Sequence, residues 1–273
     1  MPSNPSILME TETAETRRFD MAGGDIVAYT ARAPDKLTVN EDTVGVLRVG
    51  EDSAVLALAD GAGGMPAGKK ASQTAVETFL YSVANSEEET LLGAVMRSIE
   101  KANQAVLSML NGSATTLTIV TIEDNRIRAF QVGDSEALVT GQRGKLKLYT
   151  IPHSPTGLAV EAGYLDEEVA LYHPDRHLVS NFVGSVDMTI DVGGELKLSP
   201  LDTLLIASDG LTDNLFRNEV IDLVRTGPLD TALERLTAVA QGRMRDAATG
   251  LPSKPDDLSI ILFRKHKKDS KRT

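Results

Sequence analysis

The middle of the chain contains four short strand-like segments that are joined by very short connections. They lie at 117–122, 127–132, 136–140 and 145–149, and the connections contain Asp124-Asn125, Gly133-Asp134 and the run 141–144. Segments rich in β-branched residues and bounded by Gly, Asn or Asp are typical of strands. Parallel strands need a crossover of a dozen or more residues, so strands joined this closely should run antiparallel. The sequence therefore predicts an antiparallel meander here.

The rest of the chain shows strand and helix signals in separate groups. Strand signals lie at 24–29, 43–49, 54–59, 202–207 and 258–263, and helical periodicity lies at 67–83, 87–110 and 229–244. Because strands and helices do not alternate regularly, we expect an α+β fold rather than a doubly wound parallel sheet. The expected architecture is sheets packed together and covered by helices.

The domain organisation follows from the absence of a linker. No Pro-, Gly- or Ser-rich stretch divides the chain and no internal repeat is present, so we expect one domain over residues 19–264. Residues 1–18 are polar and aperiodic, and 265–273 are basic, so both ends are expected to be flexible. The segment at about 153–185 is helical or irregular.

Composition excludes several classes of function. The 273 residues include no cysteine, which rules out disulfides, thiolate zinc sites and cysteine nucleophiles. The net charge of −11 argues against nucleic acid as a partner, because binding its phosphates needs clustered basic residues. The sequence has no bilayer-length apolar run and no secretory signal pattern, so we expect a cytoplasmic protein with no membrane partner.

Four apolar strand segments carry an aspartate at one end. Asp60 follows the strand at 54–59, Asp134 follows the strand at 127–132, and Asp209 follows the strand at 202–207. Asp256 instead stands just before the last strand, at 258–263. If that strand runs antiparallel to its neighbours, all four carboxylates lie at the same end of the fold.

A cluster of carboxylates calls for a cation. Neighbouring anions repel one another and resist ionisation unless positive charge is present. Carboxylate, carbonyl and water oxygens are the ligands that Mg²⁺ and Mn²⁺ prefer, whereas zinc favours His and Cys. Two such ions can lower the pKa of a water between them and bind phosphate oxygens, which is the chemistry of phosphate-ester hydrolysis.

The alternative interpretation is that these residues are ordinary turns. Asp-Gly is a common turn dipeptide, so neither Asp60-Gly61 nor Asp209-Gly210 alone indicates a site. The repetition at the ends of four apolar strands is what favours a metal centre.

The order of these motifs resembles the metal-dependent Ser/Thr phosphatases of the PP2C type, in their compact bacterial form. The resemblance extends over about residues 24–264. It is carried by Asn40-Glu41-Asp42, Ala59-Asp60-Gly61-Ala62-Gly63-Gly64, Val132-Gly133-Asp134-Ser135, Ser208-Asp209-Gly210-Leu211-Thr212-Asp213 and Asp256-Asp257-Leu258-Ser259.

The resemblance implies two antiparallel sheets flanked by helices, in four layers, with a flap at 153–185. It implies two or three Mg²⁺ or Mn²⁺ ions per chain and phosphoprotein substrates, which could be those of a Ser/Thr kinase. In the implied ligand set, Asp60 bridges two ions, the Gly61 carbonyl binds one, and Asp209 and Asp256 complete the other. Glu41 and Asp42 are implied to hold metal-bound waters, and Asp134 and Asp213 an additional ion.

Three positions depart from the family pattern. Many members have a phosphate-binding Arg five residues before the position of Asp42, where this chain has Leu37. Lys36 is the candidate phosphate contact here, although an ammonium does not reproduce a guanidinium fork. Ala62 stands where some members have a His, and Pro152 replaces an Asp before His153, so a structural role is expected for that histidine.

Two other functions remain open from the sequence. The departure at Leu37 fits a binding or regulatory module that keeps the fold but has weak or no activity. Residues 63–70 match the phosphate-loop pattern GxxxxGK and lie between a strand and a helix, which would indicate a nucleotide hydrolase. That pattern requires Ser or Thr next, and Lys70 stands there.

Overall fold

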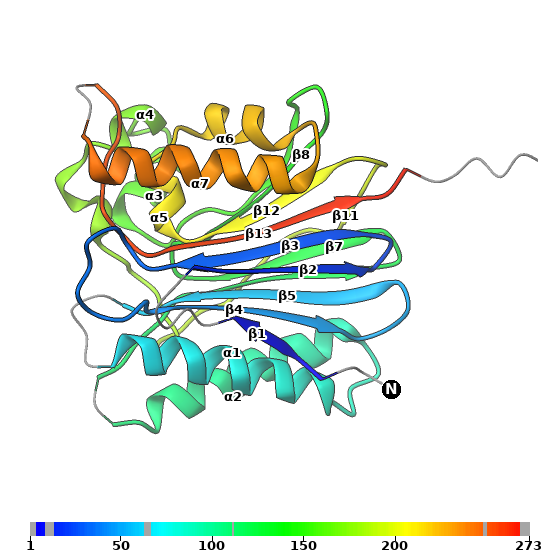
Figure 1. Cartoon of the computed structure of the whole chain (residues 1–273). Helices are drawn as coiled ribbons and strands as arrows, with labels where there is room; N and C mark the ends of the chain where they lie inside the picture. Colours follow the sequence, from blue (N-terminus) through cyan, green and yellow to red (C-terminus); the bar gives the residue numbers. More distant parts are fainter. Residues whose placement is uncertain (1–3, 9–13, 63–66, 111, 248–249, 268–273) are drawn as a thin grey trace, which may run out of the picture.

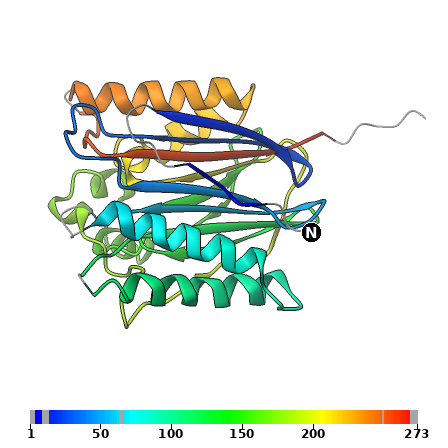
Figure 2. The ribbon, with the colours of Figure 1, turned by 60° about the horizontal axis from the view of Figure 1, so that its bottom comes forward.

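The computed structural model describes residues 4–8, 14–62, 67–110, 112–247 and 250–267. Two antiparallel sheets pack face to face in the middle, and helices cover the outer face of each sheet (Figure 1). Figure 2 shows α7 along one outer face and α1 and α2 along the other. The predicted α+β sandwich of four layers is confirmed.

The first sheet contains the strand that ends in Asp60. Its strand order is β1 (Ser6–Leu8), β4 (Asp42–Arg48), β5 (Ser53–Asp60), β6 (Leu117–Glu123), β7 (Arg126–Val132) and β10 (Asp191–Val192), with β11 (Leu196–Lys197) also on β7. Two amphipathic helices, α1 (Gly68–Ala84) and α2 (Leu91–Leu107), cover it.

The second sheet contains the last strand of the chain at its centre. Its order is β2 (Glu15–Met21), β3 (Gly24–Ala31), β13 (Leu258–Lys265), β12 (Thr203–Ala207), β8 (Glu136–Thr140) and β9 (Leu146–Tyr149). It is covered by α5 (Asp209–Thr212), α6 (Arg217–Val224) and α7 (Leu229–Arg245). β13 runs antiparallel to both β3 and β12, as the clustering of the carboxylates requires.

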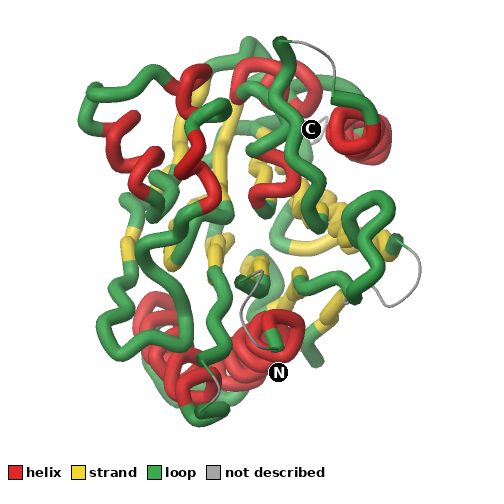
Figure 3. Tube along the Cα trace, turned by 90° about the vertical axis from the view of Figure 1, so that its left-hand side faces the viewer, coloured by secondary structure: helices red, strands yellow, loops and turns green. Residues whose placement is uncertain are grey.

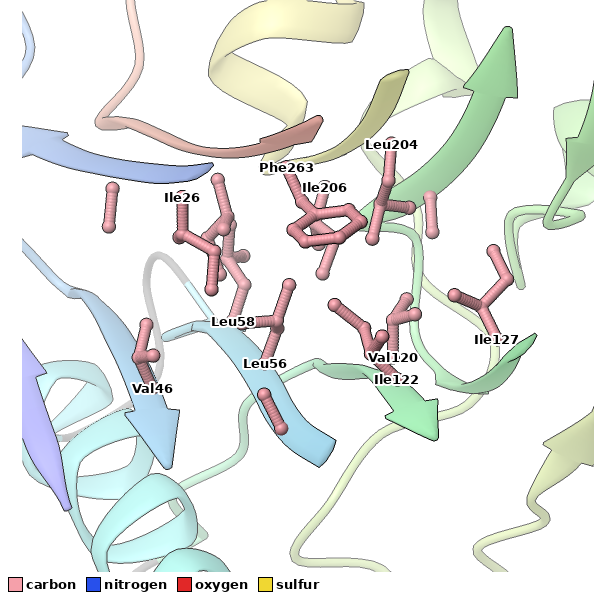
Figure 4. Close-up of a cluster of buried hydrophobic side chains, with 14 of the residues drawn as sticks. Ile26, Val46, Leu56, Leu58, Val120, Ile122, Ile127, Leu204, Ile206 and Phe263 are labelled. Carbon is pink, nitrogen blue, oxygen red and sulfur yellow. The ribbon is translucent and has the colours of Figure 1, made fainter. Parts of the chain in front are cut away.

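Strands that are buried on both faces explain the continuous apolar runs in the sequence. Along β5, Leu56 and Leu58 face the second sheet, while Val55, Ala57 and Ala59 face the helices. Figure 4 shows Leu56 and Leu58 pointing toward side chains of the opposite sheet. Alternation therefore cannot be seen in the sequence of this strand, because both of its faces exclude water.

The predicted meander is wrong at one connection. β6 pairs with β7 and β8 pairs with β9, but β7 and β8 belong to different sheets. Asp124 and Asn125 both adopt positive φ, 47° and 66°, as the tight hairpin between β6 and β7 requires. Gly133 has φ of 102° and begins the crossing between the sheets. A short connection thus fixes strand direction but not sheet membership.

Two parts of the N-terminal segment form strands. Residues 6–8 form β1 on β4, and β2 begins at Glu15 and pairs with β3 along its length. Leu8 is fully buried, so one apolar side chain anchors this otherwise polar stretch. At the other end, Lys265 is a buried residue of β13, and residues 268–273 of the expected tail lie outside the described residues.

The expected flap stands at the end of the sandwich where the carboxylates were predicted to gather. It contains α3 (Pro155–Glu161), α4 (Glu167–Ala170) and a 3₁₀ turn, η1 (Pro174–His177). Figure 3 views this end of the molecule and shows short helices and loops around the strand ends. In the part of the chain that the structure describes, no helix has the length and apolar character needed to cross a bilayer.

The two Asp-Gly dipeptides are not ordinary turns. Neither Gly61 nor Gly210 has positive φ, yet both lie against another backbone segment. A Cβ on Gly210 would stand 1.9 Å from the Asp257 carbonyl oxygen, and a Cβ on Gly61 would stand 2.4 Å from the Gly68 carbonyl oxygen. Glycine is required because the backbones approach closely beside the aspartates.

We predict that Gly210→Ala destabilises the protein by about 3 kcal/mol, because small-to-large changes in a packed site cost about 1–3 kcal/mol or more. The matched control is Gly242→Ala in α7, where a Cβ meets no atom within 4 Å. That control should be neutral or stabilising by up to about 1 kcal/mol. Urea unfolding measures both, and equal stability of the two variants would contradict the prediction.

Candidate metal centre

Strand pairing brings the predicted carboxylates to one end of the sandwich. In the first sheet, Asp42 at the start of β4 lies directly opposite Asp60 at the end of β5. In the second sheet, Ala207 pairs with Ile260, so Asp209 after β12 and Asp256 before β13 share an end. Strand pairing therefore places these carboxylates at one end of the sandwich, as the sequence predicted.

Asp134 reaches the same end through the connection between the sheets. It follows Gly133, and hydroxyl groups fix the connection: Thr118 Oγ1 donates to the Ser135 carbonyl at 2.7 Å, and Thr116 Oγ1 lies 2.9 Å from Ser135 Oγ. Asp213, at the C-terminal cap of α5, faces the site from the second sheet. The predicted acids therefore come from both sheets.

Burial and mutual repulsion raise the pKa values of Asp60, Asp134 and Asp256. Burial is the larger cause for Asp60, and the negative charges of Asp42, Asp209 and Asp256 add to it. The pKa of Asp134 is raised by burial and then by Asp209, and burial with the charge of Asp209 raises the pKa of Asp256 to about 6. Such a group of acids gains free energy from any cation that it can bind.

Lysine supplies positive charge to one side of the cluster. Lys254 Nζ lies 2.5 Å from Asp209 Oδ2, 2.8 Å from Asp213 Oδ2 and 3.3 Å from Asp256 Oδ2. Lys254 received no role from the sequence, although it stands two positions before the predicted ligand Asp256. Asp209, Asp213 and Asp256 therefore converge on an ammonium.

The remaining oxygens fit a hard divalent cation. Asp42 Oδ1 and Asp209 Oδ1 are buried and accept no hydrogen bond from the described residues. Ser208 Oγ donates to Asp42 Oδ2 at 2.9 Å, so Oδ1 is the oxygen of Asp42 that is left without a partner among these residues. Buried acceptors without partners are costly, and oxygen donors of this kind suit Mg²⁺ and Mn²⁺. The residues present therefore fit the expected metal ions.

The tightest group of potential ligands among the described residues lies elsewhere. Atoms of Asp20, Asp25 and His266 are all within 4.8 Å of one another, but the three residues are exposed. The oxygens of Asp60, Asp209 and Asp256 are not grouped this closely. Exposed carboxylates pair with water at little cost, so the buried cluster is the stronger candidate.

Lys36 is held by two acids. Its Nζ lies 2.6 Å from Asp257 Oδ2 and 3.0 Å from Glu41 Oε2. Asp257 also accepts the backbone N–H groups of Ala33 and Glu41, both at 2.8 Å. Asp257, which received no role from the sequence, thus fixes the loop that carries Glu41. The neighbouring Leu37 is 99% exposed and contacts no part of the cluster.

His153 has the contacts of a structural residue. Its Nδ1 accepts the Gly133 N–H at 3.2 Å, which leaves Nε2 to donate to Asp191 Oδ2 at 3.0 Å. The buried ring therefore joins the start of the flap to the crossing between the sheets and to β10.

A cavity of 270 Å³ lies between the flap and the second sheet and opens onto Asp134, Asp209 and Asp213. Its wall includes Arg217, whose guanidinium lies 3.6 Å over the Tyr149 ring and binds Glu167 at 2.7 Å. Burial raises the pKa of Glu136 in the same wall to about 8. Sequence reasoning missed this cavity because its residues come from strands and helices far apart in the chain.

The phosphate-loop alternative loses its structural context. The strand before the motif, β5, pairs antiparallel with both of its neighbours, whereas a phosphate loop belongs to a strand–loop–helix unit of a parallel sheet. Residues 63–66 of the motif lie outside the described residues.

Comparison with known proteins identifies relatives of the whole fold. The profile of the family described as "Protein phosphatase 2C" matches residues 35–246. Protein phosphatase PhpP of Streptococcus pneumoniae is 29% identical over 247 residues, which are 86% of this chain and 95% of the relative.

Solved structures of phosphatases also match the fold of this chain. The PPM Ser-Thr phosphatase MsPP from Mycobacterium smegmatis, in complex with cacodylate, matches with a TM-score of 0.71 and 26% identity, over 93% of this chain and 98% of that one. The catalytic domain of the phosphatase PstP, in complex with two manganese ions, matches with a TM-score of 0.72 over 93% and 100%. At 22% identity, the second match shows the fold alone.

We predict that the protein stripped of divalent ions loses stability as pH rises from 5 to 8. The acids of the cluster have folded pKa values above their unfolded ones, so the native state releases its protons later than the unfolded state does. Stability is therefore full at low pH and falls as pH passes through the raised pKa values.

Asp134→Asn should weaken this dependence and stabilise the stripped protein at pH 8 by on the order of 1 kcal/mol, or about 2–4 °C in Tm. Thermal melts in EDTA across this pH range measure the effect. The exposed Asp187→Asn serves as control and should behave as the wild type. A steeper pH dependence in Asp134→Asn than in the wild type would refute the repulsion argument.

We predict that Lys36→Met lowers stability by about 1–3 kcal/mol, because it leaves the Asp257 carboxylate, which is 3% exposed, without its counter-charge. Urea unfolding measures the loss, and Lys197→Met, on an exposed residue of β11, is the control. A variant with wild-type stability that binds phosphate more weakly would show instead that Lys36 is a phosphate contact.

Proposed function

Because this chain belongs to the protein phosphatase 2C family, we propose that it removes phosphate from phosphoserine and phosphothreonine of proteins with a water activated by divalent metal ions. The observation that carries the proposal is the set of partly buried, mutually repelling carboxylates at the ends of β5, β7, β12 and β13. The relatives are named as protein phosphatases and Ser/Thr phosphatases, which supports the same activity.

The proposed cofactor is Mg²⁺ or Mn²⁺, two or three ions per chain. Asp60, the Gly61 carbonyl, Asp209 and Asp256 would hold two ions, with Glu41 and Asp42 behind them. Asp134 and Asp213 would hold the additional ion. Bound divalent ions would lower the pKa of a water and neutralise phosphate oxygens.

The chain's own residues support this chemistry by holding the ligands in place. Ser208 fixes one oxygen of Asp42, and Asp257 fixes the backbone of Glu41. The close backbone approach at Gly61 and Gly210 packs the chain next to Asp60 and Asp209 against neighbouring segments. A site whose ligands are already oriented needs little reorganisation during the reaction.

The substrate is proposed to be a folded or partly folded phosphoprotein, including targets of a Ser/Thr kinase, in the cytoplasm. We propose that the segment around the phosphorylated residue sits against the flap and the cavity beside Asp134. Their shape and their acidic residues would then influence which substrates are accepted.

We predict that Mn²⁺ or Mg²⁺ supports hydrolysis of p-nitrophenyl phosphate and of a phosphothreonine peptide, and that EDTA abolishes it. Asp60→Asn and Asp209→Asn should each lower kcat/KM by roughly 100-fold or more, since several kcal/mol of charge stabilisation are lost at about 1.4 kcal/mol per tenfold. Asp20→Asn, in the exposed acidic group, is the matched control and should retain activity.

The alternative of an inactive binding or regulatory module makes the opposite prediction. A folded wild-type protein that binds Mn²⁺ but turns over neither substrate would exclude the phosphatase proposal and favour that alternative.

A further inference from the structure

The position of Lys254 is fixed by its backbone. The Lys254 N–H donates to Asn214 Oδ1 at 2.9 Å, and its carbonyl accepts from Asn214 Nδ2 at 2.8 Å. Asn214 is fully buried at the end of α5 and also donates to the Gly210 carbonyl. The loop before β13 is therefore attached to the segment that carries Asp209, and the side chain of Lys254 is directed at the carboxylates.

The ammonium is surrounded by carboxylates, because Lys254 Nζ contacts Asp209, Asp213 and Asp256. The side chain is 20% exposed, so one flank remains open to water. Lys254 thus offsets part of the negative charge of the carboxylate cluster.

A divalent ion bound to the carboxylate oxygens that Lys254 contacts would lie close to the positive charge of the ammonium. Mg²⁺ binds carboxylate oxygens at about 2.0–2.1 Å, and an ammonium donates to them at about 2.7–2.9 Å. Like charges this close repel strongly near a protein surface, and a divalent ion repels an ammonium twice as strongly as a monovalent ion does. Asp209 Oδ1 and Asp60 do not contact Lys254, so one ion could bind without moving it.

We propose that Lys254 is an internal competitor for divalent metal at the Asp209–Asp256 side of the site, so that a second ion binds there only by displacing the ammonium. The inference rests on the proposed metal-dependent function. The flexible four-carbon stem and the open flank allow the ammonium to move out without a change in the backbone. The free ion concentration needed to fill the site is then set by this residue.

Isothermal titration of the metal-free protein with Mn²⁺ tests the proposal without an activity measurement. Lys254→Met should tighten the weaker Mn²⁺ site by about tenfold or more and leave the tighter site unchanged. Lys254→Arg, which keeps the charge, should not tighten it. Lys147→Met is the matched control, because Lys147 makes a similar half-buried ion pair with Asp202 before β12, at the opposite end of that strand.

The outcomes separate this inference from the proposed function. Mn²⁺ binding that is unchanged or weaker in Lys254→Met, with a wild type that binds Mn²⁺, overturns the competition alone. A wild type that binds no Mn²⁺ overturns the metal-dependent function and the competition together.

A second measurement uses only the wild-type protein, in case Lys254→Met does not fold. Acetic anhydride modifies free lysine amines, and mass spectrometry follows the rate at Lys254 with and without Mg²⁺. Displacement should raise the modification rate at Lys254 several-fold in Mg²⁺, while the rate at Lys147 stays constant. An unchanged rate at Lys254 in a protein that binds Mg²⁺ would overturn the proposal.

Discussion

Repulsion between buried carboxylates is the interaction on which the functional end of this protein depends. Antiparallel pairing within each sheet places Asp42 against Asp60 and Asp209 beside Asp256, at one end of the sandwich. Burial limits the screening of these charges by water, and it raises the pKa values of Asp42 and Asp60. Where these acids are ionised, nearby cations offset the repulsion. Lys36, Lys254 and the proposed metal ions are three parts of that compensation.

The same closeness explains the glycines and hydroxyls around the acids. Backbone segments approach closely at Gly61 and Gly210, where a Cβ would overlap the carbonyl of Gly68 or of Asp257. Ser208 binds Asp42 and also accepts the Ser259 N–H at 3.0 Å, so one hydroxyl connects β12, β13 and β4. Packing and ligand geometry are therefore set by the same contacts, and a change that relaxes one disturbs the other.

The two lysines show how the chain divides this compensation. Lys36 bridges Glu41 and Asp257 at the edge of the cluster, where its role is to fix a loop. Lys254 reaches Asp209 and Asp256, which are proposed ligands, so its charge competes with metal. Lys36 therefore adds stability to the fold, whereas Lys254 raises the free concentration of divalent ion that is needed to fill the site.

Much of this protein could be read from the sequence because local patterns reflect local geometry. The strand at 54–59, the helix at 229–244 and the aspartates at strand ends were predicted from apolar runs and turn residues, and the structure brings those aspartates to one end. The crossing at Gly133, the strand at Ser6–Leu8 and the contacts of Lys254 were not predicted. Each depends on which segments meet in space, and pairing between distant segments leaves no periodic trace in the chain. The sequence determined which residues could bind a cation, and the tertiary structure decided which of them lie together and which of them contact a lysine.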